Sequence, residues 1–99
     1  MAVRLIISMD AVPGKRDELI EVFRVRSPEA RQEPGCEEYE LYQSTERPDL
    51  LMLVERWSDE ASLAVHAELN KQRSSKGESA NLGSLRAGPS RAERYTIPE

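Results

Sequence analysis

The sequence predicts an α+β fold built from four strands and two helices within 99 residues. Short segments rich in β-branched and aliphatic residues stand near the start, in the middle and at the end of the chain. Two longer segments between them carry apolar residues at helical spacing. Proline-glycine pairs and a polar turn separate the segments. The length suits one domain, which we expect to span residues 1–99.

The N-terminal third predicts a strand and a helix. Residues 3–9 are mostly aliphatic and stand before a Pro-Gly pair at residues 13–14, where we expect the helix to begin. Acidic side chains follow in its first turn, where they interact favourably with free backbone N–H groups. We expect Ser27-Pro28 to kink or restart the helix, because proline removes a donor and disfavours the α conformation at Ser27. The apolar stripe of this helix is formed by Leu19, Ile20, Phe23 and Ala30.

The middle of the chain predicts a β-hairpin and a second helix. Residues 39–42 alternate between polar and apolar side chains, residues 45–49 form a turn, and residues 50–57 follow as the next strand. Ser58 is a suitable N-cap for a helix that we expect to run to about Leu69.

The remaining chain completes the fold. Residues 70–89 are polar and basic, so we expect a loop, or a loop around one short helix, before a last strand at residues 91–97. The order β-α-β-β-α-β is the ferredoxin-like arrangement, in which an antiparallel sheet carries both helices on one face. Residues 5–7 and 50–54 are apolar at consecutive positions, so both faces of these strands need burial. We therefore expect a homodimer packed sheet to sheet.

The composition argues against several classes of partner. The chain is acidic overall, with a formal net charge of −4 and few aromatic residues, which does not fit a protein that binds nucleic acid. No apolar run approaches the roughly 20 residues that cross a membrane, so we expect no membrane partner. The lone Cys36 is compatible with a reducing compartment, and we expect a cytoplasmic location. The basic side chains of residues 70–95 suit a solvated loop, or alternatively a small anionic ligand.

Several short motifs occur in order along the chain. PGK at residues 13–15 opens the first helix, PGCEEYELY at residues 34–42 leads into the second strand, and VERW at residues 54–57 ends the third. The helix that follows carries His66, and RY at residues 94–95 stands in the last strand. In this order and spacing the motifs resemble the antibiotic biosynthesis monooxygenase (ABM) family of dimeric αβ-barrel proteins.

The resemblance implies a dimeric α/β barrel with a pocket in each subunit between the helices and the sheet. It also implies one of several activities, which include cofactor-independent oxidation of quinols and polyketide phenols, haem degradation and isomerisation. The haem-degrading branch is set aside, because its axial histidine stands beyond the second helix and the chain has no histidine after His66. The sequence departs from the family at residues 70–89, which predicts a more open or more polar pocket mouth.

His66 is the candidate catalytic residue. It is the only histidine, and its imidazole is the side chain whose ordinary pKa lies nearest neutrality. In an apolar pocket a neutral imidazole can take a proton from a phenol, so that the anion passes an electron to dioxygen. The alternative is a histidine at the edge of the pocket that only packs or forms hydrogen bonds.

Three residues are candidates for substrate binding. Trp57 either forms an aromatic wall for a planar substrate or packs in the core. Glu55 lies on an otherwise apolar face, so it either binds substrate or is paired with Arg4, Arg56 or Arg94. The resemblance alone selects Tyr39, whose hydroxyl we expect to project into the cavity.

No cofactor or metal is expected, because one histidine and one cysteine cannot build a metal cluster of recognisable spacing and no Gly-rich phosphate loop is present. The favoured function is a cofactor-independent monooxygenase acting on a small aromatic substrate, a quinol or a polyketide-type phenol. The alternatives are an isomerase or another enzyme for a small polar metabolite, and a non-catalytic small-molecule-binding domain.

Overall fold

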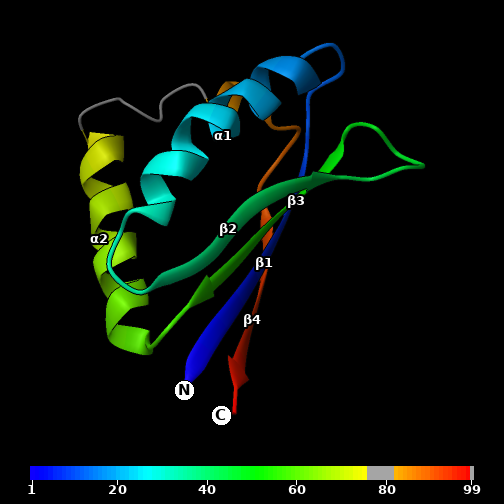
Figure 1. Ribbon diagram of the computed structural model, residues 1–99. Helices are drawn as coiled ribbons and strands as arrows, with labels where there is room; N and C mark the ends of the chain where they lie inside the picture. Colours follow the sequence, from blue (N-terminus) through cyan, green and yellow to red (C-terminus); the bar gives the residue numbers. More distant parts are fainter. Residues whose placement is uncertain (76–81, 99) are drawn as a thin grey trace.

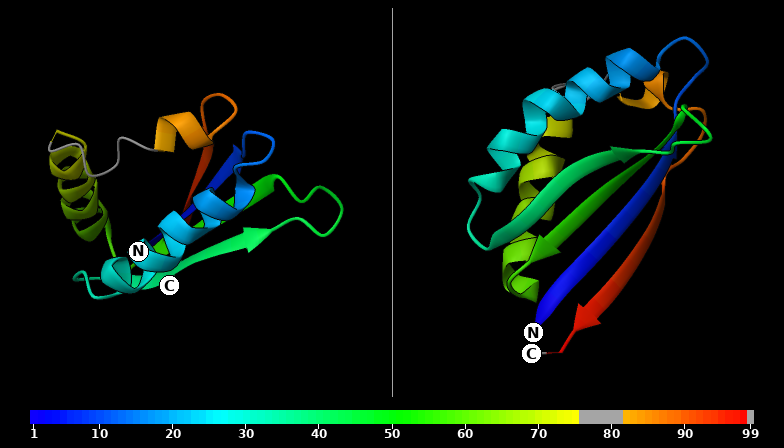
Figure 2. Two further views of the ribbon diagram at one scale, coloured as in Figure 1. Left: turned by 90° about the horizontal axis from the view of Figure 1, so that it is seen from above. Right: turned by 45° about the vertical axis from the view of Figure 1, so that its right-hand side comes forward.

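The computed structural model describes residues 1–75 and 82–98. Four antiparallel strands form one sheet in the order β2-β3-β1-β4, and the helices lie on one side of it (Figures 1 and 2). The predicted ferredoxin-like order is thus confirmed. Within residues 70–89, expected as a loop with or without one short helix, residues 70–75 continue the second helix and a short helix forms at Leu82–Leu85, whereas residues 76–81 lie outside the described residues. The elements are β1 (Ala2–Asp10), α1 (Arg16–Arg31), β2 (Cys36–Gln43), β3 (Leu50–Trp57), α2 (Glu60–Ser75), α3 (Leu82–Leu85) and β4 (Arg91–Ile97).

The helix boundaries differ from the sequence-based expectation. No restart interrupts α1, and Pro28 lies inside it because Ser27 and Ala30 are buried and hold the last turn against the core. The second helix runs past Leu69 to Ser75. Its cap is Asp59 rather than Ser58, since the Asp59 carboxylate accepts a hydrogen bond of 2.7 Å from the backbone of Ser62.

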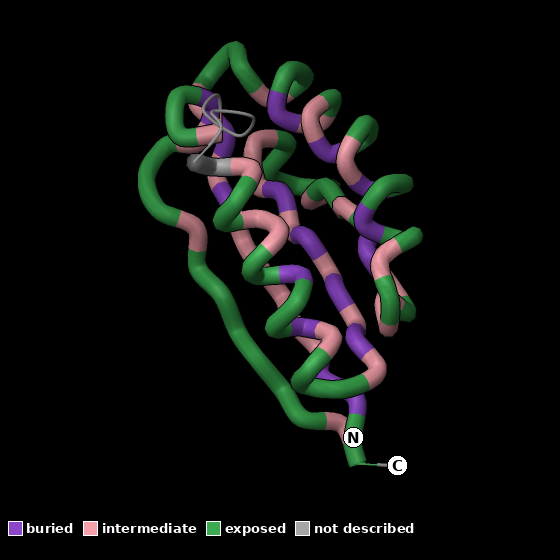
Figure 3. The backbone as a smooth tube through the Cα atoms, turned by 90° about the vertical axis from the view of Figure 1, so that its left-hand side faces the viewer, coloured by how far each residue is buried: buried purple, intermediate pink, exposed green. Residues whose placement is uncertain are grey.

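The strand register separates an apolar, helix-facing side of the sheet from an open side. Alternation along β3 buries every second residue on the helix-facing side, as the banding of the tube in Figure 3 shows. Leu53 pairs with Ile7 of β1 and with Leu41 of β2, so these three residues share that side. The core that forms there includes the fully buried side chains of Val3, Leu19, Leu51 and Trp57.

The opposite side of the sheet carries apolar residues with no covering element among the described residues. Ile6 pairs with Val54 across the β1–β3 ladder, and both are only half-buried. The Tyr42 and Tyr95 side chains are exposed. The described helices are too short or too polar to cross a membrane.

Candidate functional site

A cavity of about 210 Å³ lies between the helices and the sheet. The strands provide its floor, α1 and α2 provide one polar side chain each, and the chain around α3 closes it. Its walls combine apolar residues with a few polar groups, as is usual for sites that bind small molecules. The lining residues are Ile7, Met9, Phe23, Arg26, Tyr39, Leu53, Glu55, Asn70, Leu82, Arg86 and Ser90.

Glu55 is the carboxyl group of this cavity. It is 2% exposed, and its Oε1 accepts a hydrogen bond of 2.9 Å from Trp57 Nε1. The same oxygen lies 3.6 Å from His66 Nε2. Burial raises the pKa of Glu55 above its ordinary value of 4.5, and the Trp57 hydrogen bond and His66 offset only part of that rise. Glu55 is therefore a stronger base than an ordinary carboxylate.

The expected pairing of Glu55 with an arginine is wrong. Each candidate arginine has another partner: Arg4 Nη1 lies 2.6 Å from Glu38, Arg56 Nε lies 2.9 Å from Glu37, and Arg94 pairs with Glu60. Arg4 and Arg56 alternate onto the open side of the sheet, whereas Arg94 shares the side of Glu55 across Leu5 but pairs with Glu60 instead.

His66 lies behind Glu55 and is 3% exposed. Its Nδ1 is 2.8 Å from Glu33 Oε1, and its Nε2 is 3.0 Å from Asn70 Nδ2. Arg26 donates to Asn70 Oδ1 at 2.5 Å, so the amide nitrogen of Asn70 must face the histidine. Nε2 therefore accepts a hydrogen bond from Asn70, and Nδ1 is directed at the Glu33 carboxylate.

Two aromatic rings enclose the imidazole. The Trp57 ring is fully buried, with its centroid 4.4 Å from that of His66 and an interplanar angle of 33°. The Tyr39 ring stands nearly edge-on to it at 5.8 Å. Burial, and then the neighbouring Glu55, raise the pKa of the Tyr39 phenol, so Tyr39 keeps its proton and serves as a donor rather than a base.

The four predicted site residues thus come together in one cluster. Glu55 and Tyr39 line the cavity, whereas His66 and Trp57 form the layer behind them. Sequence reasoning missed Glu33, which stands in the loop before β2, where no periodic pattern fixes the direction of a side chain. Asn70 carried a usable signal, because it follows His66 by four residues on a helix and so shares its face.

Gly35 fixes the loop that carries Glu33. Its φ of +80° lies in the left-handed region, and its carbonyl accepts a hydrogen bond of 2.8 Å from the Ser58 backbone. An added Cβ would collide with the Ser62 side chain at the start of α2. The loop is thus held against α2, whose next turn presents His66.

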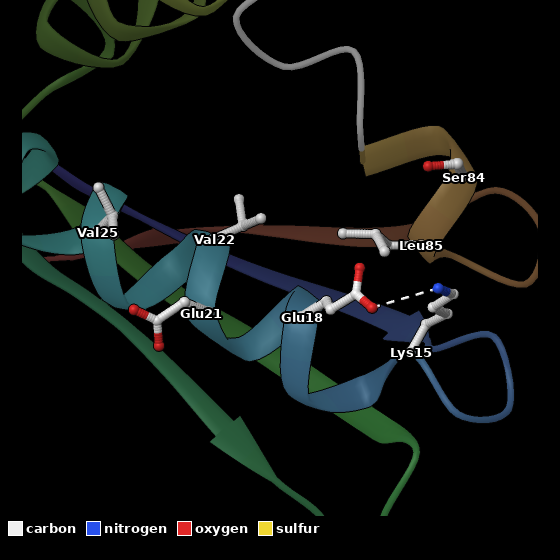
Figure 4. A pocket seen from close by; sticks show the side chains of 7 residues that line it. All are labelled: Lys15, Glu18, Glu21, Val22, Val25, Ser84 and Leu85. Atoms are coloured by element: carbon white, nitrogen blue, oxygen red, sulfur yellow. Dashed lines mark hydrogen bonds and ion pairs between the residues drawn. The ribbon is translucent and has the colours of Figure 1, made fainter.

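A larger hollow of about 640 Å³ lies between α1 and α3, away from this cluster (Figure 4). It is lined mainly by exposed side chains, including the Lys15–Glu18 pair at 3.2 Å. Because it offers no buried ionisable group, it is a weaker candidate for chemistry. Within the described part of the chain, no three His, Cys, Asp or Glu side chains are arranged to hold a metal ion.

Comparison with known proteins places the chain. The sequence profile of antibiotic biosynthesis monooxygenases matches residues 2–74. The chain belongs to this family. No curated protein sequence matches significantly.

Solved structures confirm the fold of this ABM protein. A conserved protein from Methanosarcina mazei Go1 has a TM-score of 0.83 and 26% identity, over 96% of this chain and 91% of that chain. A Caulobacter crescentus CB15 protein, whose assignment to the antibiotic biosynthesis monooxygenases is itself inferred, has a TM-score of 0.86 and 22% identity, over 99% of this chain and 91% of that chain. Rv0793 from Mycobacterium tuberculosis has a TM-score of 0.82 and 24% identity, over 100% of this chain and 97% of that chain.

The region matched by the ABM profile contains the whole polar cluster. Glu33, Glu55, His66 and Asn70 all lie within residues 2–74. The cavity wall contributed by residues 82–90 lies beyond the matched region. The cluster therefore lies within the family portion of the chain, whereas Leu82, Arg86 and Ser90 of the cavity wall lie outside it.

Proposed function

We propose that the protein is a cofactor-independent monooxygenase that oxidises a small electron-rich phenol or quinol with dioxygen. The observation that carries this proposal is Glu55, a buried carboxyl with a raised pKa at the wall of the cavity. A base whose pKa is raised toward neutrality is better matched to a phenolic proton than an ordinary carboxylate.

The proposed reaction begins with transfer of the phenolic proton to the Glu55–His66 pair. The substrate anion then gives one electron to dioxygen, and the resulting superoxide recombines with the substrate radical. At an anthrone-type CH₂ carbon, the resulting peroxide anion takes the proton back from the Glu55–His66 pair. Loss of one water from the hydroperoxide then leaves a carbonyl. The carbon is oxidised, one oxygen atom stays on it, and the other leaves as water.

The surrounding residues have distinct proposed roles. Glu55 faces the cavity and takes the proton, and His66 behind it supports this step as a base, because its Nε2 lies 3.6 Å from Glu55. A proton that reaches Nε2 forms an imidazolium between the Glu33 and Glu55 carboxylates, after Asn70 gives up its hydrogen bond. Trp57 orients Glu55, and Tyr39 donates a hydrogen bond to the substrate.

The cavity favours a small substrate. Its volume of about 210 Å³ lies below the roughly 300–1,000 Å³ common for drug-sized ligands, so one or two fused rings suit it better than a large polyketide.

We also propose that two copies associate through the open side of the sheet and that the protein acts in the cytoplasm. Both proposals follow from the half-buried apolar residues on that side and from the sequence.

Oxygen consumption tests the proposed function. Purified protein, without added metal or flavin, is given a panel of hydroquinones and anthrone-type phenols. Uptake above the autoxidation blank is expected, and Glu55→Gln is expected to lower it by roughly 10²–10⁴-fold, because the substitution keeps the shape and removes the base. His66→Ala is expected to lower it as well.

Glu40→Gln is the matched control. Glu40 stands on β2 with its side chain on the open side of the sheet, so this change alters a carboxylate without touching the cavity. Its activity should equal that of the unmodified protein. If the folded protein consumes no oxygen above the blank, the monooxygenase proposal fails and an isomerase or a binding domain on the same scaffold takes its place.

A further inference from the structure

Two half-buried arginines at the cavity have no carboxylate partner among the described residues. Arg26 comes from α1 and Arg86 follows α3, and both line the cavity that Glu55 faces. The Nε atom of each is buried without a hydrogen-bond partner. Among the described residues, neither guanidinium lies within ion-pair distance of a carboxylate. A buried N–H without an acceptor is costly, so the two groups are suited to an acceptor that enters from outside.

The other arginines of this fold provide a contrast. Most of them form ion pairs with carboxylates of the chain: Arg4 with Glu38, Arg16 with Asp49, Arg24 with Glu21, Arg56 with Glu37, Arg91 with Asp10 and Arg94 with Glu60. An acidic chain offers many carboxylates, yet none is placed against Arg26 or Arg86 in the described structure. Their side chains are left for the cavity.

The charge of the cavity wall favours an anion. The charged lining residues are two guanidinium groups and one carboxyl, that of Glu55. Even with Glu55 ionised, the wall carries an excess of positive charge, and the remaining lining is mainly apolar. A cavity of this size brings both guanidinium groups within reach of the same small ligand.

We propose that the substrate is a hydroxyaryl carboxylate, a phenol or quinol whose ring also carries a carboxylate that Arg26 and Arg86 hold. This inference rests on the proposed function and names its substrate class. A guanidinium presents a fork of donors that matches the two oxygens of a carboxylate. A neutral phenol offers one oxygen, and its proton must stay available to Glu55. The apolar wall of Ile7, Met9, Phe23 and Leu53 packs against the ring.

The carboxylate would also orient the substrate. With its charged end held at Arg86 and Arg26, the ring extends over the sheet toward Glu55 and Tyr39. Arg26 additionally holds Asn70, which faces His66, so it links anion binding to the proton-accepting cluster. Arg86 has no such second role, and it lies outside the region that the ABM profile matches. Arg86 is therefore the cleaner position to test.

Anaerobic titration calorimetry at pH 7 tests the inference on the full chain, using 2,5-dihydroxybenzoate and its methyl ester as probes. The ester lacks the negative charge of the carboxylate and carries one additional methyl group. We expect the carboxylate to bind at least about tenfold more tightly than the ester, the effect of a charge-assisted hydrogen bond. Arg86→Gln should abolish this preference, Arg86→Lys should keep part of it, and Arg26→Gln should weaken it.

The control is Arg24→Gln, which removes an exposed arginine of α1 that is paired with Glu21, and it should keep the full preference. Equal affinities for both probes in the unmodified protein, or no measurable binding of the carboxylate, would overturn the inference. A preference that survives both Arg26→Gln and Arg86→Gln would also overturn it.

Binding without oxygen separates this inference from the proposed function. If the protein consumes oxygen with an uncharged hydroquinone but binds the carboxylate no more tightly than the ester, the monooxygenase proposal is supported. The proposed binding of a carboxylate by Arg26 and Arg86 is then contradicted. Tighter binding of the carboxylate than of the ester, when the protein consumes no oxygen with either probe, supports the anion site and contradicts the monooxygenase proposal.

Discussion

At the residue scale, the buried carboxyl of Glu55 couples protonation to stability. Burial raises its pKa in the folded chain, so the folded protein binds this proton more tightly than the unfolded chain does. The stabilising contribution is full below the ordinary pKa of 4.5 and is lost as the pH rises through the raised pKa. The Gln side chain of Glu55→Gln stays neutral at every pH. We therefore expect this variant to unfold at a higher temperature than the unmodified protein at pH values above the raised pKa, and at a more similar temperature at low pH.

Thermal unfolding followed by circular dichroism across pH 4–8 measures this difference, and Glu40→Gln serves as the exposed control. A difference between Glu55→Gln and the unmodified protein that stays constant with pH would contradict the expected titration. In the proposed reaction the same carboxylate determines how activity depends on pH, since Glu55 must be ionised to take a proton. Activity should therefore rise with pH through a midpoint above 4.5.

The residues of the cluster were predictable to different degrees. Alternation along β3 gave Glu55 and Trp57 a common face, and helix spacing turned His66 toward the sheet. The arginine partners of Glu55 were predicted wrongly, because Arg4 and Arg56 alternate onto the other side of the sheet and Arg94 pairs with Glu60. Glu33 could not be predicted from a periodic pattern, because it stands in a loop whose path depends on tertiary contacts.

At the element scale, the turn before β2 determines how α2 and the sheet meet. Gly35→Ala would place a Cβ in the left-handed region and against the Ser62 side chain. We expect it to destabilise the fold by about 1–2 kcal/mol for the backbone and about 1–3 kcal/mol more for the collision. Chemical denaturation measures the loss, and oxygen uptake should fall with it because Glu33 shifts away from His66.

Gly14→Ala is the matched control, because Gly14 has a φ of +84° but no atom within 4 Å of an added Cβ. It should show only the backbone cost of about 1–2 kcal/mol and keep its activity. Equal losses in the two variants would show that the contact with Ser62 does not hold the loop.

The elements were predicted better than their ends. Strand alternation and helical spacing depend on which side of a segment faces the core, and this information is present in the sequence. Helix ends depend on local competition: Asp59 caps α2 in place of Ser58, and α1 continues through Pro28 because the buried Ser27 and Ala30 hold the turn. Tertiary packing therefore decides where a helix begins and ends, and the sequence of the segment alone contains little information about that packing.

At the scale of the whole molecule, the sheet has one side that the described helices leave open. Ile6 and Val54 pair there and are only half-buried, and Met52 lies beside them on β3. The consecutive apolar residues in β1 and β3 indicate that both sides of the sheet need burial. A second copy offers the same apolar side, so the proposed sheet-to-sheet homodimer would bury both surfaces with one symmetric contact.

Ile6→Glu tests this association. In the dimer the introduced carboxylate would be buried without a partner, so we expect the variant to be a monomer. Light scattering during size-exclusion chromatography should give a mass near the 11.2 kDa of one chain for the variant and about twice that for the unmodified protein. Val25→Glu, at a 57% exposed position on α1, should remain a dimer. A dimeric Ile6→Glu protein, or a monomeric unmodified one, would contradict the arrangement. Because the cavity lies on the opposite side of the sheet, a folded Ile6→Glu monomer should still distinguish the two benzoate probes, which separates assembly from ligand recognition.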